Sequence, residues 1–337
     1  MLEPAAVASR RACMVSSEKI ATELSRAFLG FRLTRVVLAF RVLHGGQLPP
    51  WLGSAWRGML GHGLKSAVCT TGLDDCRPCP LIDDCPYPVL FEARVPLNAP
   101  MLGSNTKAPG PYTLLASPGG RVASDDELTL RLTLFGEHGR DAALLARVFA
   151  LGADSGLGER RLGLTLQRLA EVDLDGGERE LGLAQLHQAP PSLAPLAALP
   201  PCPPSLAIHL LTPLRLRVRN RYVGPDCLCF GDFLSHLLRR CSLLLQFYQQ
   251  TPVELPFREL VDLAHKLQFS HTELRWEDMA RHSSRQERVV PMGGLVGTMY
   301  LEDERLQALW PLLWLGQWTQ LGKGVSMGLG EYRLEAA

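Results

Sequence analysis

The chain has 337 residues, a formal net charge of +1, 46% hydrophobic residues and 20% charged residues. That length is enough for two domains with buried cores, and the balance of charge and hydrophobicity excludes an intrinsically disordered protein. No apolar run approaches the roughly 20 residues that a membrane-spanning helix needs, and the first 30 residues lack the apolar core of a signal peptide. We therefore expect a cytoplasmic protein with no membrane partner.

Most of the basic residues are arginine. Only five of the 35 are lysine, so arginine dominates. Arginine binds phosphate through two parallel hydrogen bonds, which lysine cannot do. The codon usage of a GC-rich genome would produce the same bias, so the positions of the arginines must decide between the two explanations.

The first half of the chain predicts a strand, a helix, a strand, a helix and a strand, after a short helix at residues 17–29. We expect these five elements at residues 31–43, 51–68, 128–135, about 140–152 and 164–172. The stretch 188–204 then holds seven prolines and predicts a stiff linker.

The second half predicts the same order of elements. They are expected at residues 206–211 (strand), 230–248 (helix), 288–300 (hairpin or strand pair), 306–318 (helix) and 328–334 (strand). Two such series predict an α+β protein with two tandem ferredoxin-like (RRM-like, split βαβ) domains. The domain limits we expect are an extension at 1–30, a first domain at 31–175 with a cysteine-rich insertion at 69–88, a Pro-rich linker at 176–204, and a second domain at 205–337.

A glycine-rich loop lies near the C-terminus. It places four glycines within nine residues, together with Lys323 and Ser326; the glycines are Gly322, Gly324, Gly328 and Gly330. Such a loop lets the backbone approach a phosphate closely, and Lys323 adds charge. It is not a nucleotide-binding Walker loop, because glycine rather than Ser or Thr follows the lysine. An ordinary tight turn remains the alternative.

Two further segments suggest a surface that binds nucleic acid. Alternate positions carry Arg215, Arg217, Arg219 and Arg221, which would share one face of an extended segment. A polar run follows later in the chain and contains Arg281, Ser284, Arg285 and Gln286, whose side chains can bind phosphate and base edges. Solvated loops are the alternative for both segments.

Four cysteines gather in the insertion: Cys69, Cys76, Cys79 and Cys85. Four thiolates within one short loop can bind a structural zinc ion or an iron–sulfur cluster. The spacing matches no standard zinc ribbon or finger, so a loop without metal remains open. We favour zinc, and expect no cofactor for catalysis.

Candidate catalytic groups accompany the first helix. His44 follows the first strand, and His62 lies on the helix beside Arg57 and Lys65. A histidine near a cation can act as general acid or base, although a lone histidine is more often structural. Fingerprints of serine hydrolases, zinc proteases and dinucleotide-binding enzymes are absent from the sequence.

These segments together resemble the CRISPR-associated precursor-crRNA processing endoribonucleases of the RAMP superfamily. The matching stretches are 53–61, 76–92, 134–136, 156–158, 212–214, 281–286, 293–297 and 322–330. The resemblance covers about residues 31–335, and its most specific part is the glycine-rich stretch. One departure is that Thr319 and Gln320 stand where related sequences often carry histidine.

The resemblance implies a metal-independent endoribonuclease that binds CRISPR repeat RNA and cuts precursor crRNA into mature crRNA. The 2′-hydroxyl would attack the scissile phosphate and leave a 2′,3′-cyclic phosphate. His44 or His62 would act as base or acid, and Arg57 and Lys65 would stabilise charge. An arginine-based site fits the composition equally well. The product would stay within an effector complex whose other subunits are partners. The alternative is a non-catalytic crRNA-binding scaffold subunit, followed by a zinc-stabilised interaction module.

Overall fold

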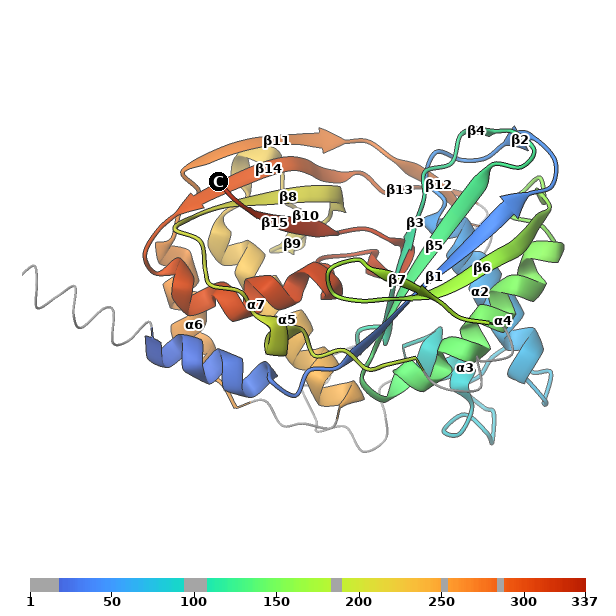
Figure 1. Ribbon diagram of the computed structural model, residues 1–337, viewed down its shortest axis with the longest axis horizontal. Helices are drawn as coiled ribbons and strands as arrows, with labels where there is room; N and C mark the ends of the chain where they lie inside the picture. Colours follow the sequence, from blue (N-terminus) through green and yellow to red (C-terminus); the bar gives the residue numbers. More distant parts are fainter. Residues whose placement is uncertain (1–17, 94–107, 183–189, 250–253, 284–287) are drawn as a thin grey trace, which may run out of the picture.

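The computed structural model describes residues 18–93, 108–182, 190–249, 254–283 and 288–337 (Figure 1). Two antiparallel sheets dominate it, and each is covered by helices (Figure 1). Of the helices in these ranges, none is long and apolar enough to cross a membrane.

The first sheet has the strand order β3-β5-β1-β6-β7. Its strands are β1 (Leu33–Val42), β3 (Tyr112–Ala116), β5 (Glu127–Phe135), β6 (Leu164–Val172) and β7 (Glu178–Glu180). Its helices are α2 (Gly53–Val68), α3 (Pro86–Leu90) and α4 (Ala142–Asp154), the last preceded by the 3-10 helix η1 (Gly136–Asp141). Alternate β1 residues Val36, Leu38 and Phe40 join the core that α2 and α4 cover, as period-2 alternation requires. The short strands β2 (Gly46–Gln47) and β4 (Arg121–Val122) pair beside this sheet.

The second sheet has the strand order β11-β14-β8-β15. Its strands are β8 (Ser205–Leu214), β11 (His271–Glu277), β14 (Gly294–Glu302) and β15 (Tyr332–Ala336). Its helices are α5 (Phe230–Tyr248), α6 (Phe257–Lys266) and α7 (Leu306–Thr319). Smaller elements are η3 (Pro195–Ala198), β9 (Arg217–Val218), β10 (Arg221–Tyr222), η4 (Pro225–Cys227), β12 (Ala280–Ser283), β13 (Arg288–Pro291) and η5 (Val325–Met327).

Both sheets have the ferredoxin-like arrangement. When the four main strands of each half are numbered in chain order, they lie side by side in the sheet in the order 4-1-3-2. That is the order that a split βαβ repeat produces. The prediction of two tandem ferredoxin-like folds is therefore confirmed. The strand at 31–43 and the helices at 51–68, 230–248 and 306–318 lie within a residue or two of their predicted ends. The domain boundaries themselves stay a prediction.

The first described helix, at residues 18–28, packs on the second half of the chain. Its buried side chains Ile20, Leu24 and Phe28 belong to the same core as α5 and α7. The helix predicted at 17–29 is thus present, and apolar burial holds it in place.

The described part of the Pro-rich stretch packs against α7. Trp310 and Trp314 of α7 donate indole hydrogen bonds to the carbonyl oxygens of Pro200 (2.7 Å) and Pro195 (3.1 Å). Residues 190–204 therefore follow α7 closely, beyond the spacer role that their composition predicts.

Three local predictions were wrong. The segment 215–221 is a hairpin of β9 and β10 instead of one extended strand, because Arg219 and Asn220 have φ angles of 47° and 66°. Two consecutive positive φ values form the tight turn that two-residue hairpins use. Within 288–300, β13 pairs with β12, and β14 pairs with β8 and β11 instead. The last strand begins at Tyr332 instead of residue 328, because Gly328 and Gly330 have φ angles of 88° and 78°, which an extended strand does not have.

Candidate active site

The glycine-rich loop of the second domain docks on the start of α2 in the first. Trp51 donates its indole N–H to the carbonyl oxygen of Met327 at 3.0 Å. A methyl group placed on Gly53 would lie 1.8 Å from that same oxygen, so only glycine permits this approach. A site built here contains groups from both halves of the chain.

The loop glycines serve this close packing. Gly322, Gly324, Gly328 and Gly330 all have positive φ, between 78° and 92°. A methyl group on Gly330 would lie 1.7 Å from the Leu321 carbonyl oxygen, and one on Gly328 would lie 2.8 Å from that of Leu114. The sequence predicted that these glycines allow close approach to a ligand. In the structure, Gly328 and Gly330 allow close approach to protein backbone. Its Lys323 side chain is exposed, Ser326 is half-buried, and the buried Gln320 beside it is only 1% exposed.

Three arginines meet beside this loop, and we call them the arginine cluster. They come from α2, from the end of β8 and from β12: Arg57, Arg215 and Arg281. The Arg281 guanidinium donates to the Ser54 hydroxyl at 3.4 Å. Burial lowers the pKa of Arg281, and the positive charges of Arg57 and Arg215 lower it further. The backbone N–H of Lys323 donates to the Arg215 carbonyl at 3.0 Å, which ties the glycine-rich loop to the cluster.

The cluster is supported by rings and carbonyl groups. The Arg57 guanidinium lies 4.2 Å from the centre of the Phe91 ring and donates to the Phe91 carbonyl at 3.1 Å. The Arg215 guanidinium lies 4.6 Å from the centre of the Tyr222 ring and donates to the Pro291 carbonyl at 3.2 Å. These supports hold the cations without neutralising them.

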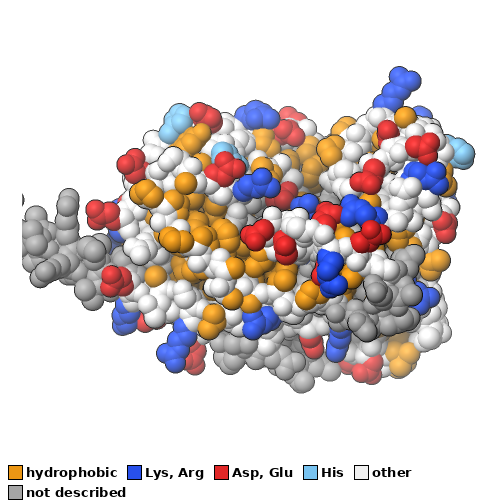
Figure 2. All heavy atoms as spheres, in the orientation of Figure 1, with side chains coloured by type: hydrophobic (Ala, Val, Ile, Leu, Met, Phe, Trp, Pro, Cys, Tyr) orange, Lys and Arg blue, Asp and Glu red, His pale blue; other side chains and the backbone are white. Residues whose placement is uncertain are grey.

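The charge of the cluster is uncompensated in the part of the chain that the structure describes. None of the ion pairs there involves a member of the cluster, and the Nε atom of each member is buried without a hydrogen-bond partner. Three gathered like charges repel unless an anion joins them, so the arrangement fits a phosphate group. On the face shown in Figure 2, basic and acidic side chains are interspersed, so surface charge alone does not mark a binding surface there.

The four predicted catalytic residues are not brought together. Arg57 belongs to the cluster, but His44 and His62 are exposed, the first just after β1 and the second on α2. Lys65 faces the cysteine loop, where its ammonium donates to the Asp74 carbonyl at 3.0 Å. In the described contacts, neither histidine touches the arginine cluster.

The predicted RNA-binding residues also divide. Arg215 is only 8% exposed, whereas Arg217, Arg219 and Arg221 are exposed on the β9–β10 hairpin. The expected common face is therefore wrong, because the turn at Arg219 reverses the chain. Arg281 lies in the arginine cluster, and Ser284, Arg285 and Gln286 lie outside the described residues.

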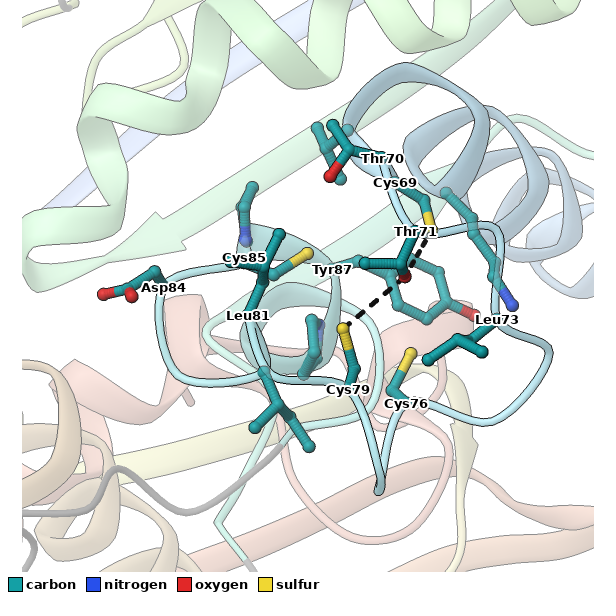
Figure 3. Close-up of a pocket in the computed structure, with 15 residues that line it drawn as sticks. Cys69, Thr70, Thr71, Leu73, Cys76, Cys79, Leu81, Asp84, Cys85 and Tyr87 are labelled. Atoms are coloured by element: carbon teal, nitrogen blue, oxygen red, sulfur yellow. Dashed lines mark hydrogen bonds between the residues drawn. The ribbon is translucent and has the colours of Figure 1, made fainter.

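The four cysteines of the insertion line one pocket of about 210 Å³ (Figure 3). The Thr71 hydroxyl lies between the sulfur atoms of Cys69 (3.9 Å) and Cys79 (3.6 Å). All four are free thiols. Within the described ranges, no three His, Cys, Asp or Glu side chains are already gathered as a metal-binding group.

Sequence reasoning missed three residues that shape the site. Ser54 receives a hydrogen bond from Arg281, and the rings of Phe91 and Tyr222 lie against Arg57 and Arg215. An aromatic residue close to an arginine-rich hairpin is a signal that could have indicated Tyr222. The other two contacts join segments distant in sequence, for which the chain offers no local pattern.

Two family models match this chain. Residues 31–191 match the AF_1859_N family model, described as an N-terminal domain, and residues 208–332 match the model of the CRISPR-associated endoribonuclease Cas6. Over residues 208–332 the chain is therefore similar to the Cas6 endoribonucleases, in agreement with the resemblance to CRISPR-associated endoribonucleases seen in the sequence.

Solved structures that are similar to this chain agree on the fold. A Cas6 product complex superposes with a TM-score of 0.54 at 20% identity, covering 90% of this chain and 99% of that chain. A partial Cas6-RT-Cas1–Cas2 complex gives a TM-score of 0.57 at 13% identity, covering 91% of this chain and 46% of that chain.

A curated relative is an uncharacterized protein of Archaeoglobus fulgidus, 32% identical over 93 residues. That match covers 27% of this chain and 30% of the relative. The chain thus spans under a third of this relative and under half of the Cas6-RT-Cas1 chain that it superposes on.

Proposed function

We propose that this protein binds CRISPR repeat RNA and cuts precursor crRNA at the arginine cluster. The observation that carries the proposal is the convergence of Arg57, Arg215 and Arg281, without an acidic partner among the described residues, beside the glycine-rich loop of the segment that is similar to Cas6. A phosphate bound there would receive guanidinium hydrogen bonds from both halves of the chain.

The reaction we propose is metal-independent. The 2′-hydroxyl upstream of the scissile phosphate attacks phosphorus, the bond to the 5′-oxygen breaks, and a 2′,3′-cyclic phosphate and a 5′-hydroxyl remain. Negative charge grows on the non-bridging oxygens during this attack. We assign the stabilisation of that charge to Arg57 and Arg281, which protein groups hold in position. Preorganised donors of this kind contribute about 100- to 1,000-fold to rate. The donor set supports this proposal, since Mg²⁺ prefers carboxylate oxygens and the cluster offers cations.

Proton transfer is assigned to His44 or His62. Both are exposed and so can reach a bound RNA strand, although neither touches the arginine cluster. Lys65 contacts the cysteine loop, so we propose a supporting role for it instead of direct charge stabilisation.

We infer the remaining RNA contacts from the basic side chains that are exposed to solvent. The β9–β10 hairpin presents Arg217, Arg219 and Arg221 to solvent, and Lys323 projects from the glycine-rich loop. We propose that they hold the phosphates of the repeat stem through its shape. Product would then stay bound and pass to other subunits of an effector complex; one similar structure is a Cas6 product complex and another is an assembly with Cas1 and Cas2.

One assay tests the proposed chemistry. Labelled repeat RNA is incubated with the protein in excess EDTA, beside a matched RNA with hydrogen in place of the 2′-hydroxyl upstream of the cut. We expect cleavage of the first RNA only, with equal binding of both. Cleavage of the deoxy substrate would refute the mechanism. Tight binding without cleavage of either RNA would favour the scaffold function.

A further inference from the structure

The cysteine loop at residues 69–85 connects two helices at fixed points. Cys69 is the residue at the C-terminal end of α2, and Cys85 is the residue before α3. Cys76 and Cys79 lie between them, and the N–H of Cys79 donates to the Cys76 carbonyl at 3.0 Å. All four residues line the pocket drawn in Figure 3.

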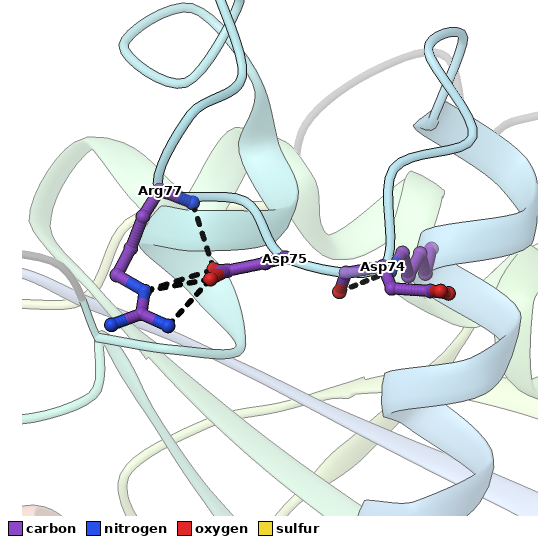
Figure 4. A network of polar contacts seen from close by, with 4 residues as sticks. Asp74, Asp75 and Arg77 are labelled. Carbon is purple, nitrogen blue, oxygen red and sulfur yellow. Dashed lines mark hydrogen bonds and ion pairs between the residues drawn. The ribbon is translucent and has the colours of Figure 1, made fainter.

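This loop has little apolar burial to hold it. Two of its larger apolar side chains, Leu73 and Leu81, are 40% and 44% exposed, and Ile82 is only half-buried. Its polar contacts lie at the surface: Asp75 accepts from the backbone N–H of Arg77 at 3.0 Å and from its side-chain Nε at 2.8 Å (Figure 4). Exposed pairs of this kind contribute little to stability. A small loop without its own core normally needs a covalent or metal crosslink.

We propose that Cys69, Cys76, Cys79 and Cys85 bind one structural zinc ion. Four thiolates complete the tetrahedral sulfur coordination that zinc takes in structural sites, with Zn–S bonds of about 2.3 Å. In this structure the Thr71 hydroxyl occupies the space between Cys69 and Cys79, so binding requires the thiols to turn inward and displace it. Zinc binding releases the thiol protons and involves no electron transfer, which suits a loop with no redox role in the proposed reaction.

The ion would also position the arginine cluster; this second part rests on the proposed function. Helix α3 runs from the residue after Cys85 to the residue before Phe91. The Phe91 ring lies under the Arg57 guanidinium, and its carbonyl accepts from Arg57. The same ring packs on α2 so closely that a methyl group on Gly61 would lie 2.4 Å from it. Zinc at Cys85 therefore fixes α3, and α3 fixes Arg57 through Phe91.

The test measures metal on the full chain, purified without chelator. We expect about one zinc per chain by elemental analysis, its loss in a Cys76→Ser/Cys79→Ser variant, and its retention in Cys227→Ser, which removes an exposed thiol outside the loop. If the double variant does not fold, thiol counting on the wild type replaces it, because removing zinc should make four more thiols reactive. Iron with sulfide, or metal-free protein with the loop thiols already reactive, would overturn the proposal.

An RNA cleavage assay distinguishes the zinc site from its proposed role in positioning the arginine cluster. We expect the double cysteine variant and Phe91→Ala to cut more slowly, by up to about 100-fold, because displacement of a positioning group by 1 Å has effects of that size. Added Mg²⁺ should restore neither, and Phe91→Ala should keep its zinc. Zinc in a protein that never cuts RNA would leave the metal site standing and refute the proposed function. Cutting at full rate by the zinc-free variant would refute the positioning role.

Discussion

The docking of the glycine-rich loop on α2 can be tested with one methyl group. In a Gly53→Ala variant the added carbon would lie 1.8 Å from the Met327 carbonyl oxygen and 2.9 Å from the Trp51 indole nitrogen. Reaching an ordinary contact of roughly 3.5 Å requires the loop to retreat by about 1.7 Å. That retreat would break the hydrogen bond from Trp51 to Met327.

The expected cost follows from this displacement. Overpacking of a tight contact destabilises a protein by about 1–3 kcal/mol, which for a domain of this size lowers the melting temperature by roughly 2–4 °C per kcal/mol. Cleavage should suffer more, because the loop carries the backbone N–H that contacts Arg215, while α2 carries Arg57. A shift of more than 1 Å between them should slow cutting by about 100-fold.

Gly58→Ala is the matched control on the same helix. A methyl group there would contact nothing within 4 Å, so it should stabilise the helix by about 0.5–1 kcal/mol. Thermal melting and single-turnover cleavage are measured for both variants and the wild type. The reasoning is refuted if the two substitutions change the melting temperature in the same direction, or if Gly53→Ala cuts at the wild-type rate.

Further predictions concern single side chains. Arg281→Ala should lower the single-turnover rate about 100- to 1,000-fold at saturating protein while the fold is kept, and an unchanged rate would exclude it from the active site. Arg217→Ala, on the exposed hairpin, should weaken binding at all RNA sequences and reduce the slope of log affinity against log salt by about one, leaving the saturated rate unchanged. His44→Ala and His62→Ala, compared over pH, should identify the general base, since only its loss should abolish the pH dependence of the cleavage rate; two unchanged profiles would favour an arginine-based site.

Much of the fold is local in the sequence, and that part was predictable. The β-branched and aromatic residues of β1 indicate a strand, and the alternation in β5 indicates which of its sides faces the core. Strand β11 was missed because it is exposed along most of its length, so no apolar alternation marks it. Strand β3 has only five residues, too few for a clear period.

The arginine cluster was not predictable, because its members have no neighbours in sequence. Arg57, Arg215 and Arg281 meet only after both domains have formed and packed together. Alternation at 215–221 suggested a basic face, but it could not show that Arg219 and Asn220 form a turn. Asparagine adopts the left-handed conformation more readily than most residues, and it was the available signal for that turn. The cysteine cluster, by contrast, lies in one short loop and was visible at once.

The origin of the cluster constrains how the site can work. Arg57 comes from the first domain, and Arg215 and Arg281 come from the second, so neither domain alone can hold a phosphate among all three. The repulsion among these cations weakens domain packing when no anion is present. A bound phosphate would make the net electrostatic interaction across this contact attractive. If RNA binds at the cluster as we propose, RNA binding and domain packing would stabilise each other, in the manner of any ligand that binds only the assembled state. The tight contact at Gly53 works against the same repulsion, since it keeps the two halves of the site close before RNA arrives.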